Sequence, residues 1–156
     1  MRKKIFRLIS VVMIVGILCG MNITTILAED FSDNVLETDL DFAEDTTYSV
    51  LRGTNLNYGT SKISKLASNK VAIAGVTQCH HNCAKVYLEL YLERKVNGTY
   101  STYKSWSFTT NNASHLTKSL EVIVPSGYYY RVRGYHAAKD GSKESTTTLT
   151  SGILVK

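Results

Sequence analysis

The chain has 156 residues, a formal net charge of +5, 44% hydrophobic residues and a single proline. This length provides for one ordinary domain and excludes several large ones. The hydrophobic content excludes a collagen-like or wholly disordered chain. The charge is unevenly distributed, because residues 29–45 contain eight acidic residues whereas residues 46–156 contain 14 basic and 5 acidic residues.

Residues 1–28 have the order of a secretory signal peptide. Basic residues at positions 2–4 precede an apolar run over residues 8–19, and the small residue Ala28 stands just before two acidic residues. The run is shorter than the ~20 apolar residues of a membrane-spanning helix. We therefore expect cleavage after Ala28 and a secreted, extracellular protein without a stable membrane span. An uncleaved N-terminal anchor is the alternative.

Residues 29–47 alternate acidic residues with single apolar ones and contain neither glycine nor proline. Such a segment has too few apolar residues to form a core, which predicts a disordered stretch before a domain over residues 48–156. Its negative charge allows a second interpretation. In this one, the segment folds back onto the basic domain as a pro-segment or autoinhibitor.

From about residue 60 onward, apolar residues recur with the period of two that is typical of half-buried strands. The expected strands cover residues 62–66, 70–78, 86–93, 99–109, 116–124 and 128–136, and a final threonine-rich stretch runs through Ile153 and Val155. Asn97-Gly98 and Asp140-Gly141 predict tight turns, because Asn, Asp and Gly tolerate positive φ.

This pattern, without any segment of helical period, predicts an all-β fold. The expected architecture is an antiparallel sandwich of about seven strands, immunoglobulin-like or fibronectin III-like, with Greek-key connections. The stretch from Val122 onward resembles the part of fibronectin type III modules where a Pro/Gly corner precedes an aromatic-rich strand. In that resemblance, Tyr128 or Tyr129 takes the place of the corner tyrosine, whose hydroxyl group binds upstream backbone.

Several short motifs are distributed across residues 50–156. They are Leu51-Arg52-Gly53-x-x-Leu56, Tyr58-Gly59-Thr60-x-x-Ile63, Val71-x-Ile73-x-Gly75-x-Thr77, Tyr91-Leu92-Glu93-Arg94, Asn97-Gly98-x-Tyr100, Gly127-Tyr128-Tyr129-Tyr130-Arg131-Val132-Arg133 and His136. These motifs are similar to those of a family of small secreted proteins of Gram-positive bacteria, a domain of unknown function. The resemblance implies export and one domain, and it supplies no mechanism.

Cys79-His80-His81-Asn82-Cys83 is the dense cluster of metal-capable side chains in the sequence. An exported chain that retains two cysteines after loss of its leader fits a Cys79–Cys83 disulfide, which would add about 2 kcal/mol because it closes a small loop. Two alternatives stay open. The thiols are free in a reducing habitat, or Cys79, His80, His81 and Cys83 form a zinc site.

The sequence shows no G-x-S-x-G elbow near His115 or His136, no phosphate loop and no dinucleotide fingerprint. Glu89 and Glu93 lie on one strand face about 13 Å apart, which exceeds the separation that glycosidases use. We therefore expect a protein that is not an enzyme and needs no cofactor.

Alternation along residues 128–136 places one set of side chains inward (Tyr128, Tyr130, Val132) and the other outward (Tyr129, Arg131, Arg133, Tyr135). With neighbouring strands, the candidate binding residues are Tyr87, Tyr91, Tyr103, Tyr129, Arg131, Arg133 and Tyr135. Tyrosine is enriched on recognition surfaces. The same residue types also occur on exposed sheets as cross-strand pairs that need no ligand.

The sequence thus favours a secreted, non-enzymatic module that binds a cell-envelope or extracellular ligand, such as a polysaccharide or an anionic polymer, through this surface. The alternative is an exported antimicrobial or toxin-like effector that its acidic segment holds inactive.

Overall fold

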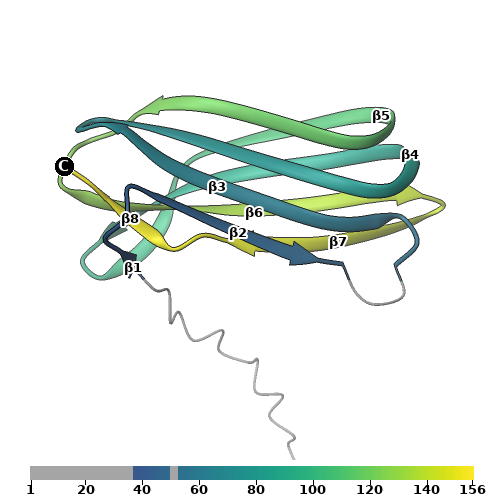
Figure 1. Cartoon of the computed structure of the whole chain (residues 1–156), viewed down its shortest axis with the longest axis horizontal. Helices are drawn as coiled ribbons and strands as arrows, with labels where there is room; N and C mark the ends of the chain where they lie inside the picture. The colour runs from purple at the N-terminus through teal and green to yellow at the C-terminus, as the bar shows by residue number, and fades with distance from the viewer. Residues whose placement is uncertain (1–36, 50–52) are drawn as a thin grey trace, which may run out of the picture. The chain divides into compact units, whose positions relative to one another are not determined.

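The computed structural model describes residues 37–49 and 53–156; the expected leader and residues 29–36 lie outside this part. The described residues form eight strands and no helix, which confirms the all-β class (Figure 1). The strands are β1 (Glu37–Thr38), β2 (Phe42–Tyr48), β3 (Leu56–Ala67), β4 (Lys70–Val96), β5 (Thr99–Ile123), β6 (Tyr128–Asp140), β7 (Ser142–Leu149) and β8 (Gly152–Val155).

The strands form one continuous sheet in the order β1-β8-β6-β4-β3-β2, with β5 paired to β4 and β7 paired to β6. The long strands β4 and β5 make one hairpin, and both turn back at the end opposite the C-terminus (Figure 1). Their register shifts there, between Gln78 and Cys83. We call β2, β3, residues 70–78 and residues 115–123 the first half-sheet. The second half-sheet consists of residues 83–96, residues 99–113, β6, β7 and β8.

Four of the expected strands are therefore halves of two longer ones. Residues 70–78 and 86–93 both belong to β4, and residues 99–109 and 116–123 both belong to β5, which ends one residue before the expected strand. The expected strands leave residues 79–85 unassigned, but backbone pairing resumes at Cys83, so the chain bends there without leaving the sheet. The immunoglobulin-like sandwich is not confirmed by this single folded sheet.

The two half-sheets pack face to face across the core. Alternation on β4 directs Val71 and Ile73 inward from the first half-sheet and Leu88 and Leu90 inward from the second, and all four are fully buried. Gly75 lies where the two half-sheets approach closely, since a Cβ atom there would lie 2.8 Å from Leu90 Cδ2 and 3.0 Å from Leu88 Cδ1. Glycine is thus required for the packing of the two half-sheets.

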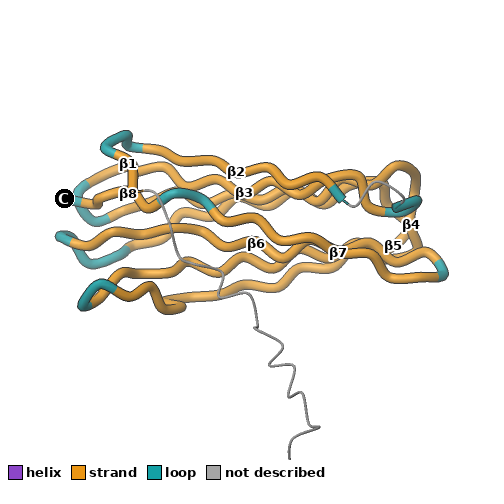
Figure 2. Tube along the Cα trace, turned by 90° about the horizontal axis from the view of Figure 1, so that it is seen from below, coloured by secondary structure: helices purple, strands orange, loops and turns teal. Residues whose placement is uncertain are grey.

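The sheet nearly closes on itself where β2 meets β7. The Asp45 carboxylate of β2 accepts a hydrogen bond of 2.8 Å from the backbone N–H of Leu149. Figure 2 shows β2 and β3 running beside β6 and β7 in the view turned by 90°. On the opposite side, β5 pairs only with β4 and forms an edge.

The prediction of a disordered segment is wrong for residues 37–47. These residues contain β1 and β2, and the side chain of Ala43 belongs to the core. Seven residues of β2 pair with β3 in regular antiparallel register, which also places Glu44 within 3.6 Å of Lys62. The domain therefore begins no later than residue 37, because sheet pairing and ion pairs offset the low apolar content.

Two predictions about the tyrosine run are also wrong. Tyr128 was expected inward, but its side chain is 38% exposed, since it stands at the very start of β6 where the core ends. The corner contact belongs to neither Tyr128 nor Tyr129. The hydroxyl group of the buried Tyr130 donates a hydrogen bond of 2.8 Å to the carbonyl oxygen of Pro125, so Tyr130 links β6 to the preceding turn.

Candidate functional site

The outward side of the second half-sheet carries most of the predicted tyrosine and arginine residues. The register of β4 and β6 pairs Glu89 with Tyr135, Tyr91 with Arg133, and Glu93 with Arg131. Directly paired residues on antiparallel strands share a face, so acidic, basic and aromatic side chains lie next to one another. We call Tyr87, Glu89, Tyr91, Arg133, Tyr135 and Lys143 the tyrosine face.

Beside the tyrosine face lies a buried ion-pair cluster. Arg131 Nε donates to Glu93 Oε2 at 2.7 Å, and Arg133 Nε donates to Glu93 Oε1 at 2.9 Å. Glu93 and Arg131 are only 6% and 5% exposed, and the Arg131 guanidinium lies 4.1 Å from the centroid of the Tyr100 ring. Charges buried to this extent are stable only when they are paired. Arg131 therefore belongs to the fold and is not accessible to a ligand.

The tyrosine face itself is more open, and its rings are held by cations. Lys143 Nζ lies 4.8 Å from the ring centroid of Tyr87 and 5.3 Å from that of Tyr135. The Arg133 guanidinium lies 4.1 Å from the ring centroid of Tyr91. These cation–π contacts fix the ring orientations, while the three tyrosines stay half-buried. The result is a surface of pre-oriented aromatic rings.

Hydrogen bonds on the tyrosine face keep its protons in place at neutral pH. The hydroxyl group of Tyr91 donates to the Glu89 carboxylate, and this bond raises the pKa of Tyr91. The hydrogen bond between Lys143 and Tyr135 raises the pKa of Lys143. Tyr91 is thus neutral and Lys143 is positively charged near pH 7.

The structure brings together four of the seven predicted binding residues, namely Tyr87, Tyr91, Arg133 and Tyr135. Arg131 lies beside them but is buried, and the half-buried Tyr129 pairs with Leu154 of β8. The placement of Tyr103 on this surface is wrong, because its ring packs against the core with its centroid 6.1 Å from that of Tyr130. A register shift between Leu92 and Glu93 changes the direction of this side chain.

Sequence reasoning missed Lys143. The signal that could have found it is the turn at Asp140-Gly141, where Gly141 has a φ of 74°. This turn folds β7 back along β6, and the register pairs Lys139 with Lys143. Lys143 is thereby placed where it contacts two tyrosine rings.

Cys79 and Cys83 lie on either side of the bend in β4, and both thiols are buried and free. Burial and the neighbouring Cys83 raise the pKa of Cys79 to about 12, and burial also raises the pKa of Cys83. Because the thiolate is the reactive form, these groups are poor nucleophiles in this state. The Cys79–Cys83 disulfide is not formed here and stays a prediction.

The alternative zinc site is not formed within residues 37–49 and 53–156, where no group of three or more His, Cys, Asp and Glu side chains could hold a metal ion. His80 and His81 are exposed, whereas the two cysteines are buried. His81 Nε2 instead lies 3.1 Å from the carboxylate of Asp140. Regular strand alternation is lost at the bend, where residues 80–82 are all exposed between the two buried cysteines, and this separates the four proposed ligands.

A second polar cluster lies in the core, around the fully buried His136. Thr77 Oγ1 lies 3.1 Å from His136 Nδ1, and Thr148 Oγ1 lies 2.9 Å from His136 Nε2 and 2.6 Å from Ser61 Oγ. Ser61, Thr77 and Thr148 are at most 1% exposed. The cluster combines a histidine with hydroxyl groups, but a substrate cannot reach it. We interpret it as a structural link between β3, β4, β6 and β7.

We expect the stability of the protein to fall in acid through His136. Burial lowers the pKa of His136 from 6.5 to about 4. Between pH 6.5 and pH 4, the histidine is therefore protonated in the unfolded chain but stays neutral in the folded protein. The free energy of unfolding should therefore fall as the pH drops from 6.5 to 4, by about 3 kcal/mol from this group. Urea unfolding at a series of pH values measures this loss.

The variant His136→Gln is the control, because glutamine keeps hydrogen-bonding capacity but does not titrate. Its free energy of unfolding should decline less steeply between pH 6.5 and 4 than that of the wild type. Equal slopes for the two proteins would show that other groups cause the acid sensitivity.

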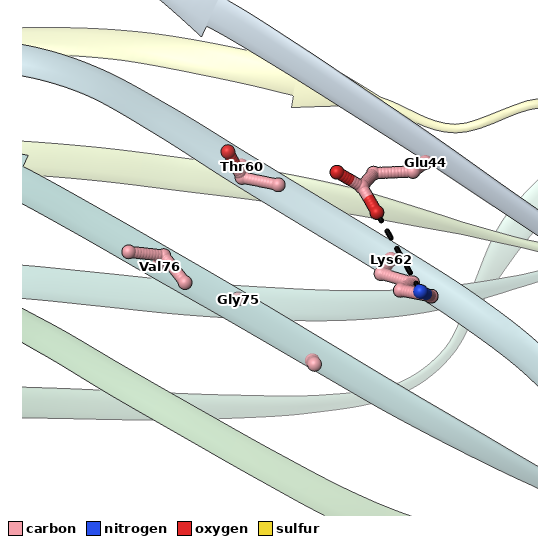
Figure 3. A pocket seen from close by; sticks show the side chains of 6 residues that line it. Glu44, Thr60, Lys62, Gly75 and Val76 are labelled. Carbon is pink, nitrogen blue, oxygen red and sulfur yellow. Dashed lines mark ion pairs between the residues drawn. The ribbon is translucent and has the colours of Figure 1, made fainter.

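A shallow depression of about 200 Å³ lies over β2, β3 and β4 on the first half-sheet (Figure 3). It is lined by Glu44, Thr60, Lys62, Ala74, Gly75 and Val76. Glu44 and Lys62 form an ion pair of 3.6 Å at its rim, and both side chains are about half exposed. Typical ligand pockets are larger, at roughly 300–1,000 Å³. We therefore assign no ligand to it.

Comparison with known proteins identifies the family. A model described as "Family of unknown function (DUF6147)" matches residues 25–152. The chain belongs to this family. The membership confirms the predicted relation to a family without an assigned function. No curated protein matches the chain.

Two solved structures are similar at low identity. The sporulation control protein Spo0M from Bacillus subtilis is 13% identical with a TM-score of 0.37, over 73% of this chain and 50% of that chain. The chain thus spans about half the length of Spo0M. Chicken MD-1 complexed with lipid IVa is 14% identical with a TM-score of 0.27, over 69% of this chain and 96% of that chain. Within the described residues, no helix is long and apolar enough to cross a membrane.

Proposed function

We propose that this protein is a secreted, non-enzymatic β-sandwich module, immunoglobulin-like in its packing, that binds a cell-envelope or extracellular ligand through the tyrosine face. The observation that supports the proposal is the group of three half-exposed rings, Tyr87, Tyr91 and Tyr135, on two adjacent strands. Their orientation is set before any ligand binds, because Lys143 and Arg133 lie against them. Preorganised tyrosines offer a large contact area at low entropic cost.

The charges around the rings favour an uncharged polysaccharide over an anionic polymer. Glu93 neutralises the buried Arg131 and also binds Arg133, and Glu89 accepts a hydrogen bond from Tyr91. Lys143 is then the exposed cation of this surface. Aromatic rings present an apolar face to a sugar ring, and the neighbouring Lys and Glu groups are suited to its hydroxyl groups.

The effector hypothesis, in which an acidic pro-segment is removed near residue 46, receives no support from the fold. Such a cut would remove most of β2 and with it Ala43, whose side chain lies in the core. Strand β2 also holds the hydrogen bond from Leu149 to Asp45. We therefore regard residues 37–47 as part of the folded domain.

Binding to purified, uncharged envelope polysaccharides by pull-down tests the proposal. We expect the wild type to bind and the variant Tyr91→Ser to bind at least about tenfold more weakly, because it loses one of the three rings of the face. The control is Tyr48→Ser, which removes an exposed tyrosine from the first half-sheet. Binding that is unchanged in Tyr91→Ser, or absent from the wild type, would contradict the proposed site.

A further inference from the structure

Five strands, β2 to β6, begin or end at one end of the sheet, and the C-terminus lies there as well. Strand β2 begins where β3 ends, and β4 and β5 double back, so each of them begins and ends at this same end. Strand β6 begins there as well, and the C-terminus lies beside it (Figure 1). We call this the C-terminal end of the sheet.

Exposed apolar side chains gather at this C-terminal end. Of the seven large hydrophobic or aromatic side chains that are exposed in the described part of the chain, six lie there. They are Leu40 (58% exposed), Phe42 (50%), Leu66 (48%), Val96 (38%), Ile123 (69%) and Tyr128 (38%). The seventh, Tyr48, lies at the other end of β2. Exposed apolar clusters of this kind mark contact surfaces.

The six side chains do not form one flat patch. Leu40, Phe42, Leu66 and Ile123 belong to the first half-sheet or its entry, whereas Val96 and Tyr128 belong to the second. The two half-sheets face each other across the core, so these residues lie around the end. A rigid partner would contact one side of such a ring of residues. A lipid layer is fluid, so it can surround all six side chains when this end of the sheet enters it.

Among the described residues, three ion pairs lie at this end of the sheet. Glu37 binds Lys95 at 2.5 Å, Asp41 binds Lys65 at 2.5 Å, and Glu121 binds Lys70. Two aromatic rings carry a cation nearby, since Arg94 lies 4.9 Å from the ring centroid of Tyr128 and Lys62 lies 5.8 Å from that of Phe42. Positive and negative side chains thus lie next to each other around the apolar groups, which complements a zwitterionic lipid headgroup layer. Long basic side chains extend into such a layer.

We propose that the C-terminal end of the sheet docks into the surface of a phospholipid bilayer, with Leu40, Phe42, Leu66 and Ile123 entering the headgroup region. Affinity in this mode scales with the apolar area that leaves water. The charge pairing makes the contact depend little on anionic lipid. The tyrosine face lies on the outward side of the second half-sheet and is a separate surface, so the two proposals fail independently.

Flotation with vesicles tests the docking. The full chain is mixed with vesicles of phosphatidylcholine alone or of phosphatidylcholine with phosphatidylglycerol, and binding should be similar for both. The triple variant Leu40→Ser/Phe42→Ser/Ile123→Ser should bind at least about tenfold more weakly, since its three largest apolar contacts are lost. Tyr48→Ser, the matched control at the opposite end, should bind like the wild type. Unfolding curves check that both variants are folded, as expected for exposed positions.

A dye reports which end of the sheet meets the lipid, even when another apolar segment of the chain also binds vesicles. An environment-sensitive dye on Ile123→Cys should shift to shorter wavelength with phosphatidylcholine vesicles, whereas the same dye on Tyr48→Cys should not. Cys19 is replaced by Ser in both proteins, and the buried Cys79 and Cys83 resist labelling. Equal dye responses at positions 123 and 48 would overturn the proposal. A shift at position 123 on self-association without vesicles would assign this end to a second copy instead.

Discussion

Replacement of Glu93 by Ala should lower the free energy of unfolding by about 3–5 kcal/mol, because it removes the buried carboxylate that Arg131 and Arg133 share. Glu93 accepts hydrogen bonds from both Arg131 and Arg133, and its side chain is only 8% exposed. Without it, two guanidinium groups repel each other beside the rings of Tyr100 and Tyr91. Denaturant unfolding followed by circular dichroism measures the loss.

The control for this prediction is Glu89→Ala, on the same strand and the same face. Glu89 is half-buried and is bound by the hydroxyl group of Tyr91, so its loss should cost less than about 1 kcal/mol, as is usual for partly exposed polar contacts. Equal losses for the two variants would mean that the cluster around Glu93 is not the stabilising element of this surface.

Replacement of Tyr130 by Ser should cost about 3–5 kcal/mol, which is the usual effect when a buried aromatic side chain is truncated. Tyr130 is fully buried, packs against the ring of Tyr103 and donates its hydroxyl proton to Pro125. Its removal leaves a cavity at the start of β6 and an unbound carbonyl group. Unfolding midpoints and slopes in urea give the change in free energy.

Two neighbouring variants separate the contributions to this effect. Tyr130→Phe should cost only about 1 kcal/mol, the net value of one hydrogen bond. Tyr129→Ser should have little effect, since Tyr129 is half-buried on the opposite side of the strand. An unfolded Tyr129→Ser protein together with a stable Tyr130→Ser protein would reverse the facing of the whole strand.

The tyrosine face was largely predictable because it depends on local alternation. Along residues 86–92 and 132–136, buried residues alternate with half-buried ones, and the apolar period of two in the sequence places Tyr91 and Tyr135 outward. The errors arise where alternation is interrupted. Tyr103 changes direction at a register shift, and Tyr128 lies beyond the end of the core. A period of two in the apolar residues shows neither where a β-bulge interrupts a strand nor where along the strand the core ends.

Arg131 illustrates a different limit. Its outward direction follows from the strand pattern, but its burial does not, because the groups that cover it come from distant segments. Glu93 reaches it across the β4–β6 register, and Tyr100 belongs to the far arm of a hairpin. Residue type predicts exposure for arginine, and only the three-dimensional pairing overrides that expectation.

The sequence by itself determined the all-β class, the turns at Asn97-Gly98 and Asp140-Gly141, and the inward and outward sides of β4 and β6. These features follow from residue period and from φ preferences, which act over a few neighbouring residues. The tertiary structure alone decided that residues 37–47 join the sheet and that β4 and β5 bend without interruption. It also decided that the Glu144 carboxylate accepts hydrogen bonds of 2.9 Å from the backbone N–H groups of Thr54, Asn55 and Leu56. Such contacts join residues about 90 positions apart, and their stability depends on pairing and burial that no local pattern records.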